Sequence, residues 1–337
     1  MGNKCPKKTC QEKKYATTAT PELAWPGETT GLLDCWCLGE ERAAVACLDG
    51  RVVVVDTTKG TCCEVGRHEA AVNCVVACRG TIYTCSRDRS IGVWGATARR
   101  LEGHELNASA VAATERIVAS GSRDATVRTW DPERGAQLSM SRIPRNLVTC
   151  LRWIPRSSSF AQGSEDLHLR VWDSRRARTP VQTMGGYEFF PLCVDATEHL
   201  LATGSKGFDG KGAELRVWDR RATRVPTHIL SGHQQDTTGC AFLPFAGEND
   251  TNPTERCVVT ASKDRSIKIW DLSKDNADRP IINDLKLADA GMYTGLAVAP
   301  DRTNLKAVTS TFQGGLACFD HAWGLIAVVP PTPADDR

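Results

Sequence analysis

Histidine, serine and aspartate recur together in this sequence, and the three residue types can combine a nucleophile with its general base. Each of three such groups is followed by a tryptophan. The groups are His68, Ser86, Asp88 and Trp94; His104, Ser122, Asp124 and Trp130; and His233, Ser262, Asp264 and Trp270. A catalytic serine would occur once, on a strained turn such as G-x-S-x-G, which the sequence lacks. Repetition beside tryptophan therefore favours a structural role, and we predict no catalytic residue.

A glycine-rich stretch, Gly204-Ser-Lys-Gly-Phe-Asp-Gly-Lys-Gly212, invites comparison with phosphate-binding loops. A P-loop needs G-x4-G-K-[ST] between a strand and a helix. Here Lys211 is followed by Gly212, and the flanking residues have the pattern of strands. We therefore predict a long hairpin loop, with neither a cofactor nor a small-molecule substrate.

The fifteen cysteines do not have the spacing of a metal site. Zinc sites use pairs such as C-x2-C, which are absent, and most of the cysteines lie in apolar runs where a reduced thiol acts as a small hydrophobe. The 42 basic and 40 acidic residues leave a net charge of +2, which gives no reason to expect a nucleic-acid partner. Without a secretory signal or a long apolar run, we expect a cytoplasmic protein.

One unit recurs along most of the chain: an apolar strand, a turn with aspartate, and a strand that ends in Trp-Asp. Ile82–Trp94 and Ile117–Asp131 are clear copies. The tryptophan or its substitute falls at positions 55, 94, 130, 172, 218, 270 and 319, at spacings of 36 to 52 residues. Gly-His pairs such as Gly103-His104 precede some units. Seven units of about 40–45 residues each, some lengthened by insertions, fit these spacings.

These residues resemble the WD-repeat (WD40) family over nearly all of residues 20–330. The resemblance implies an all-β chain forming a single seven-bladed β-propeller, with four antiparallel strands in each blade. Residues 1–19 would form a basic N-terminal tail and residues 331–337 a C-terminal tail. In the third unit the expected strands are 108–114, 117–122, 127–131 and 137–142. In the family, the histidine, the strand hydroxyl, the turn aspartate and the tryptophan form a hydrogen-bonded set, which assigns that role to the three groups above.

Two segments compete to complete the seventh blade. Leu325–Val329, near the C-terminus, is the more apolar segment, whereas Tyr15–Trp25 would join the two ends of the chain as in most of the family. The sequence leaves this choice open. The polar stretch Phe245–Arg256 is interpreted either as a solvated loop of the sixth unit or as a partner contact.

Two consecutive units end in Trp-Asp-x-Arg, at Trp172–Arg175 and Trp218–Arg221. This tandem ending resembles that of substrate receptors which dock on the propeller adaptor of cullin-type ubiquitin ligases. By that resemblance Arg175 and Arg221 would be the docking residues. The alternative is that arginine is simply common after Trp-Asp, where its stem covers the edge of the blade.

The N-terminal tail has two candidate lipidation sites. Met1-Gly2-Asn3-Lys4-Cys5-Pro6 offers Gly2 for a myristoyl chain and Cys5 for a palmitoyl chain, although Pro6 replaces the preferred serine or threonine. Five lysines among the first 14 residues, against Glu12 alone, could add attraction to anionic lipid. The sequence leaves open whether this tail is acylated and contacts a membrane or remains unmodified.

Stretches of the fourth to sixth units resemble a member of the family that is linked to cilia and flagella. They include Arg142–Pro155, Ser164–Arg175, Gly207–Gly212 and Cys240–Pro244. The resemblance implies a non-catalytic protein-interaction scaffold that works in cilium or flagellum assembly, in ciliary trafficking or as an axonemal component. Its partners would be ciliary or axonemal proteins. The alternative function is that of a ubiquitin-ligase substrate receptor.

Overall fold

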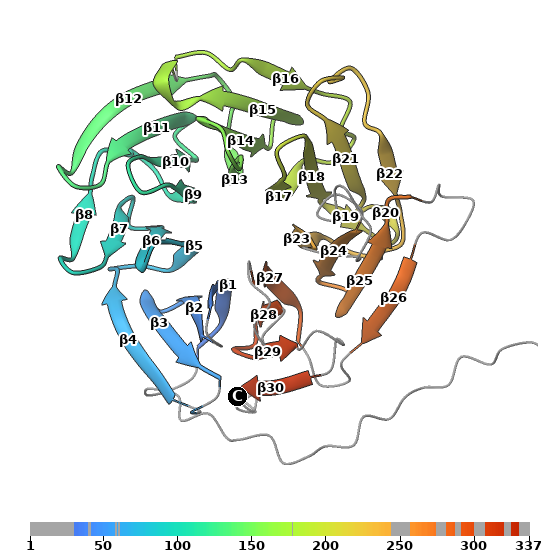
Figure 1. Ribbon diagram of the computed structural model, residues 1–337, viewed down its shortest axis with the longest axis horizontal. Helices are drawn as coiled ribbons and strands as arrows, with labels where there is room; N and C mark the ends of the chain where they lie inside the picture. The colour runs from blue at the N-terminus through green and yellow to red at the C-terminus, as the bar shows by residue number, and fades with distance from the viewer. Residues whose placement is uncertain are drawn as a thin grey trace, which may run out of the picture.

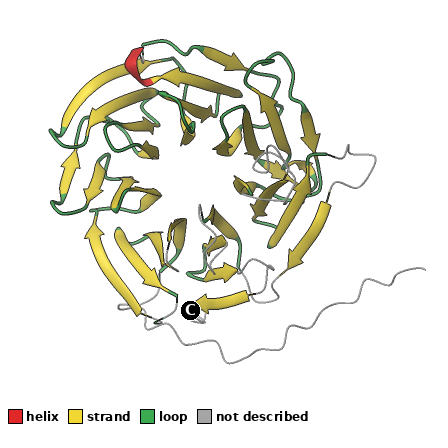
Figure 2. Ribbon diagram, in the orientation of Figure 1, coloured by secondary structure: helices red, strands yellow, loops and turns green. Residues whose placement is uncertain are grey.

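Each sequence unit folds into a four-stranded antiparallel sheet, and seven such sheets stand around a central axis in the computed structural model (Figure 1). The structure describes residues 30–39, 42–57, 59, 61–176, 178–243, 257–273, 281–286, 291–299, 307–319 and 325–329. Strands and turns make up almost all of this part of the chain (Figure 2). The predicted seven-bladed all-β propeller is therefore confirmed.

The blades follow the chain in order. Blade 1 is β1 (Leu32–Gly39), β2 (Arg42–Cys47), β3 (Arg51–Asp56) and β4 (Thr61–Arg67). Blade 2 is β5 (Val72–Cys78), β6 (Thr81–Ser86), β7 (Ile91–Trp94) and β8 (Arg99–Leu101). Blade 3 is β9 (Ala108–Ala113), β10 (Val118–Ser122), β11 (Thr126–Asp131) and β12 (Ala136–Arg142). Blade 4 is β13 (Val148–Trp153), β14 (Ser159–Ser164), β15 (His168–Asp173) and β16 (Gln182–Met184), with a short 3-10 helix at Ser174–Arg176.

The last three blades carry the insertions. Blade 5 is β17 (Pro191–Ala196), β18 (Leu200–Ser205), β21 (Leu215–Asp219) and β22 (His228–Leu230), and a small hairpin of β19 (Gly207–Phe208) and β20 (Lys211–Gly212) stands between β18 and β21. Blade 6 is β23 (Thr237–Phe242), β24 (Cys257–Ser262), β25 (Ser266–Asp271) and β26 (Ile281–Lys286). Blade 7 is β27 (Tyr293–Val298), β28 (Ala307–Thr311), β29 (Leu316–Phe319) and β30 (Leu325–Val329). The hairpin confirms the long loop predicted at the glycine-rich stretch.

The second and third strands of a blade supply its core because both of their faces are covered by neighbouring blades. In blade 3 every residue of β10 is buried, whereas the outer strand β12 is mostly exposed. The tryptophans that end the third strands, Trp130, Trp172, Trp218 and Trp270, are at most 2% exposed. Blades 1 and 7 have Val55 and Phe319 at this position. Burial of these large side chains between sheets accounts for the period seen in the sequence.

Leu325–Val329, not an N-terminal segment, provides the fourth strand of blade 7. β30 pairs with β29 along the whole of its length, from Leu316 opposite Val329 to Phe319 opposite Leu325. Each four-stranded sheet is thus built from one continuous stretch of chain. The competing segment Tyr15–Trp25 and the tail residues Gly2 and Cys5 lie outside the described residues, as does the stretch 245–256.

A repeated contact joins the innermost strands of successive blades. The register of each inner strand shifts near its start, and in five of the seven blades the side chain at that irregularity donates to a backbone carbonyl of the next blade. These bonds are Asn73 to Ala108, Ser109 to Val148, Thr149 to Pro191, Thr238 to Tyr293 and Thr294 to Leu32, at 2.5–2.9 Å. The last of them connects blade 7 to blade 1, so polar contacts as well as apolar packing close the ring.

Candidate functional site

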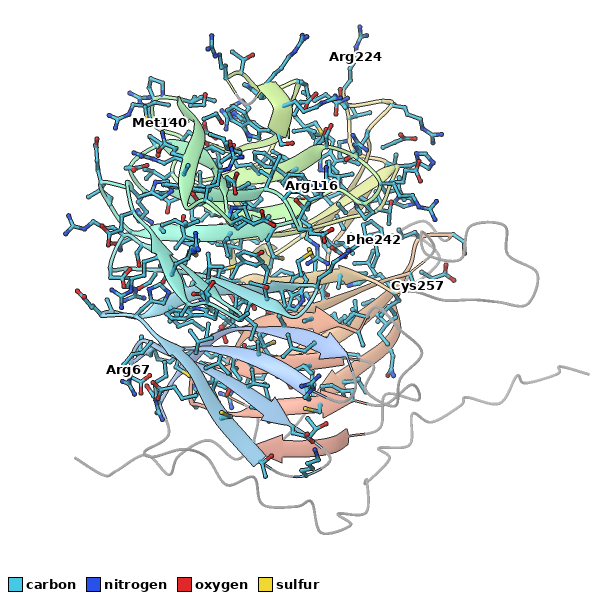
Figure 3. The ribbon with its side chains drawn as sticks, turned by 60° about the vertical axis from the view of Figure 1, so that its left-hand side comes forward. Arg67, Arg116, Met140, Arg224, Phe242 and Cys257 are labelled. Carbon is cyan, nitrogen blue, oxygen red and sulfur yellow. The ribbon has the colours of Figure 1, made fainter. Side chains whose placement is uncertain are left out.

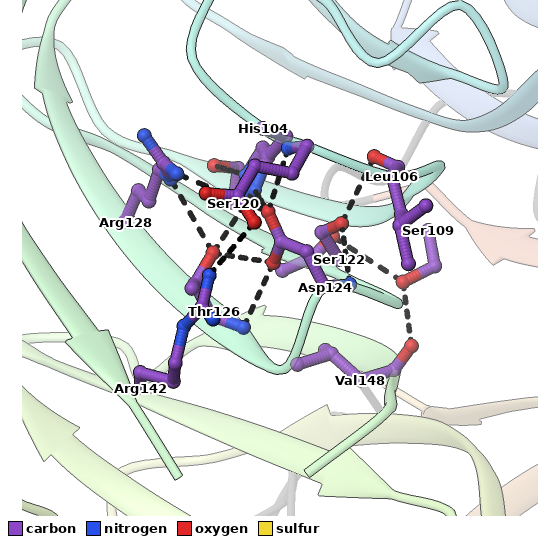
Figure 4. Close-up of polar contacts among 12 residues, drawn as sticks. His104, Leu106, Ser109, Ser120, Ser122, Asp124, Thr126, Arg128, Arg142 and Val148 are labelled. Atoms are coloured by element: carbon purple, nitrogen blue, oxygen red, sulfur yellow. Dashed lines mark hydrogen bonds and ion pairs between the residues drawn. The ribbon is translucent and has the colours of Figure 1, made fainter. Parts of the chain in front are cut away.

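The polar core of blade 3 is a series of hydrogen bonds that begins at Trp130. Figure 4 shows its members His104, Ser120 and Asp124. The Trp130 indole N–H donates to Ser120 Oγ at 2.8 Å, and Ser120 Oγ lies 2.7 Å from His104 Nε2. His104 Nδ1 lies 3.0 Å from Asp124 Oδ2. An indole N–H can only donate and a carboxylate can only accept. The proton of the histidine is therefore on Nδ1, and Ser120 donates to Nε2.

Blades 2 and 6 repeat this chain with threonine in place of serine. Thr84 Oγ1 lies 2.7 Å from Trp94 Nε1 and 2.8 Å from His68 Nε2. Thr260 Oγ1 lies 2.8 Å from Trp270 Nε1 and 2.7 Å from His233 Nε2. His68 and His233 bond Asp88 and Asp264 through Nδ1, at 2.8 and 3.1 Å.

The bridging hydroxyl therefore lies two residues before the predicted one in all three blades. Ser86, Ser122 and Ser262 instead donate to the backbone carbonyls of Ala70, Leu106 and Gln235, and accept the backbone N–H of the turn aspartate. Side chains two residues apart on a strand point to the same face, so the sequence pattern alone could not separate the two positions. The histidines, aspartates and tryptophans are where the resemblance placed them.

The ionisation of these sets suits a buried structural network. Burial lowers the pKa of His68 even though the nearby Asp88 opposes this, so the ring is neutral at pH 7. Burial alone would raise the pKa of Asp88, but hydrogen bonds from Ser90 and His68 outweigh it and set the pKa at about 2. The pKa values of Asp124 and Asp264 are lowered further, again because hydrogen bonds exceed the effect of burial. The bridging serine or threonine hydroxyl of each set already accepts the indole N–H of the tryptophan and donates to Nε2 of the histidine.

Sequence reasoning missed the equivalent sets of blades 4 and 5. In blade 4, Trp172 Nε1 donates to Gln162 Oε1 at 3.1 Å, and the Gln162 amide donates to Asn146 at 2.7 Å. In blade 5, Trp218 Nε1 donates to the hydroxyl of Tyr187 at 2.8 Å. A signal existed: Thr84, Ser120, Gln162 and Thr260 each precede their tryptophan by ten residues.

Four blades are linked by contacts at the central channel. The guanidinium of Arg152, from β13 of blade 4, lies over the ring of Trp36 in blade 1, 4.4 Å from its centre. Its Nε lies 2.7 Å from Asp195 Oδ1 of blade 5, whose other oxygen accepts the Phe242 N–H of blade 6. Arg152, Trp36 and Asp195 lie far apart in the sequence, so no sequence pattern predicted these contacts across the ring. An arginine that crosses the channel adds a cation–π contact and an ion pair to the closure of the ring.

The buried thiols are ordinary core residues. Cys47, Cys85, Cys150, Cys193, Cys240, Cys257 and Cys318 are buried. Burial raises the pKa of Cys37, Cys47 and Cys150 to about 12, so these groups stay protonated. Within the described ranges, no group of three or more histidine, cysteine or acidic side chains could hold a metal ion. No helix among the same residues is long and apolar enough to cross a membrane.

The two Trp-Asp-x-Arg endings have the same geometry. Arg175 bonds Asp173 through Nε and Nη2, at 3.0 and 2.7 Å, and Arg221 bonds Asp219 in the same way, at 2.9 and 2.7 Å. Both side chains are exposed, by 72% and 71%. The paired carboxylates hold both guanidiniums in one orientation at the same edge of consecutive blades. The structure thus presents Arg175 and Arg221 as a matched pair on the surface.

The family model for the WD domain, G-beta repeat (WD40), matches residues 95–131, 142–173 and 224–271. These segments include parts of blades 2 to 6 and contain three of the Trp-Asp endings, those of Trp130, Trp172 and Trp270. These segments match WD40 repeats, and the chain that contains them folds as a seven-bladed β-propeller. Such propellers are usually non-catalytic and generally bind other proteins.

Curated relatives of this WD40 propeller match parts of it. A "Ribosome biogenesis protein WDR12 homolog" of Ixodes scapularis is 30% identical over 139 residues, which cover 39% of this chain and 33% of that protein. The "Nuclear distribution protein nudF" of Aspergillus niger is 26% identical over 216 residues, 57% of this chain and 47% of the relative. The "U5 small nuclear ribonucleoprotein 40 kDa protein" of Dictyostelium discoideum is 30% identical over 116 residues, 32% of each chain. The propeller thus spans about a third to a half of the length of these relatives.

Proposed function

We propose that this WD40 propeller is a non-catalytic scaffold that binds other proteins during the assembly or maintenance of cilia and flagella. The observation that carries the proposal is the resemblance of blades 4 to 6 to WD repeat-containing protein 31. It lies in linkers and insertions, where WD40 repeats of different function differ from one another. The names of the three relatives described above do not refer to cilia, so the proposal depends on these stretches.

The hairpin β19–β20 is the most distinctive of these stretches. Gly207 N–H donates to Asp236 Oδ1 and Gly210 N–H to the Gln234 carbonyl, both at 3.0 Å, which fixes the hairpin against blade 6. A Cβ on Gly207 would lie 2.2 Å from the Ala213 nitrogen, so the turn requires glycine. The hairpin presents Phe208, whose side chain is 76% exposed. A rigid loop that holds an aromatic side chain in solvent supports a role in binding a partner.

Localisation of two tagged forms in a flagellated cell tests the proposal. We expect the wild-type chain, tagged at its C-terminus, to be enriched in isolated flagella. If mild detergent releases it and Gly2→Ala leaves the flagellum, the N-terminal tail is a lipid anchor, because one acyl chain with a basic patch holds a protein at a membrane. If both forms remain with the microtubules, the propeller is an axonemal component. Absence of the wild-type chain from flagella would reject the ciliary role.

The matched pair Arg175 and Arg221 favours a second candidate, a substrate receptor of a cullin-type ubiquitin ligase. Charge reversal at both positions is expected to abolish binding to the purified propeller adaptor, since each guanidinium would be replaced by a carboxylate. Arg123→Glu with Arg134→Glu is the control, because these two exposed arginines lie in blade 3. Adaptor binding that survives Arg175→Glu/Arg221→Glu in a folded protein would exclude this candidate.

A further inference from the structure

Seven arginines gather where blades 4 and 5 present their Trp-Asp ends. Two successive turns provide six of them, and the turn between β13 and β14 provides the seventh. We call these residues the arginine platform: Arg156, Arg175, Arg176, Arg178, Arg220, Arg221 and Arg224. In Figure 3, Arg224 projects away from the ribbon at this end of the molecule.

The platform has a large excess of positive charge. The ion pairs seen among the described residues bring three carboxylates to its arginines: Asp173 and Asp219 in the paired endings, and Glu198, whose Oε2 lies 3.5 Å from Arg156 Nη1. In the described part of the chain, seven positive charges thus lie beside three negative ones, whereas the net charge of the whole chain is only +2. The remainder of the protein is close to neutral, so the charge of the platform is a local feature of two blades.

Contacts between blades hold the backbone of the platform in place. Ser141 Oγ of blade 3 donates to the Arg178 carbonyl at 2.6 Å, and the Gln182 amide of blade 4 donates to the Arg220 carbonyl at 2.9 Å. Arg220 Nη1 in turn donates to the Glu198 carbonyl at 2.6 Å. The turns that present the charges are thus fixed to three neighbouring blades. A fixed array loses little entropy when a ligand binds.

The residue types favour carboxylates as the ligand groups. Every cation of the platform is an arginine, whose planar guanidinium forms paired hydrogen bonds with a carboxylate, as Arg175 and Arg221 already do within the chain. Val181 and Val225, exposed by 59% and 68%, lie in the same two turns and offer apolar contact to a peptide. The platform contains no aromatic side chain on which a base could stack.

We propose that the arginine platform binds an acidic polypeptide segment, rich in glutamate or aspartate, of a partner protein. The glutamate side chains pair with guanidiniums of consecutive blades while the backbone of the segment passes over Val181 and Val225. The inference does not rest on the ciliary role, because it follows from the charge and rigidity of this surface. It differs from docking through Arg175 and Arg221 alone, because it assigns most of the attraction to their neighbours.

Binding of a fluorescent twelve-residue peptide rich in glutamate tests the proposal, with fluorescence anisotropy as the readout. We expect Arg176→Glu/Arg178→Glu/Arg224→Glu to weaken binding at least tenfold. The matched control, Arg79→Glu/Arg116→Glu/Arg134→Glu, reverses three exposed arginines of blades 2 and 3 and is expected to change it less than threefold. Both variants leave Arg175 and Arg221 unchanged. A melting temperature close to that of the wild type would show that each variant folds.

Three results would overturn the proposal. The first is failure of the wild-type protein to bind the peptide at 50 mM salt. The second is an equal loss of binding in the control variant, because binding would then reflect overall charge. The third is preferential binding to vesicles containing phosphatidylserine, lost in the platform variant, because the surface would then be a lipid contact. None of these results depends on where the protein resides in the cell.

Discussion

Thr260→Val is expected to lower the free energy of unfolding by about 2–4 kcal/mol. Valine has the shape of threonine without its hydroxyl. The change therefore removes the group that accepts the Trp270 N–H and donates to His233 Nε2, and leaves both partners buried without a hydrogen bond. Urea unfolding followed by tryptophan fluorescence measures the difference.

Blade 7 provides the matched control for this substitution. Thr309 occupies the equivalent place in β28 and is fully buried, but its hydroxyl has no hydrogen-bond partner among the described residues, and Phe319 replaces the tryptophan. Thr309→Val is thus expected to change stability by less than about 1 kcal/mol, or to increase it, because it removes an unpaired buried hydroxyl. Equal losses from the two substitutions would mean that packing, and not the hydrogen-bonded chain, carries the effect at Thr260.

The repeats made the fold predictable because their period reflects the burial of one large side chain per blade. The strands expected for the third unit, for example, end within one residue of β9 to β12. The choice between Leu325–Val329 and Tyr15–Trp25 was open because either segment could supply a last strand. Only the pairing of β30 with β29 shows how blade 7 is completed.

The polar sets were less predictable, for two physical reasons. A strand places residues i and i+2 on one face, so Ser120 and Ser122 have the same sequence signature and only the reach of Trp130 separates them. In blades 4 and 5 the tryptophan indole N–H is bonded instead by Gln162 and Tyr187. A search for histidine and serine cannot find these residues. Each hydrogen-bonded set requires an acceptor for the indole N–H, and residues of different types can provide it.

Asp124→Asn is expected to cost about 3 kcal/mol or more at pH 7. The Asp124 carboxylate accepts from His104 Nδ1, from the backbone N–H groups of Glu105 and Thr126, and from the Thr126 hydroxyl. An asparagine has one oxygen, and its amide group would face donors. Asp131→Asn is the control, because Asp131 accepts two backbone N–H groups at an exposed turn, where asparagine is readily accommodated.

The same substitution gives a defined change in pH dependence. The pKa of Asp124 is lowered in the folded chain, so its ionised form stabilises the protein above the unfolded value near 3.8, and this contribution is lost as the pH falls through the folded value. Wild-type stability is therefore expected to fall below about pH 4, and the difference between wild type and Asp124→Asn to shrink over the same range. Urea unfolding at pH 7, 4 and 3 measures both curves. A constant difference at all three values would show that Asp124 contributes through shape alone, because its charge would then have no part in the stability of the blade.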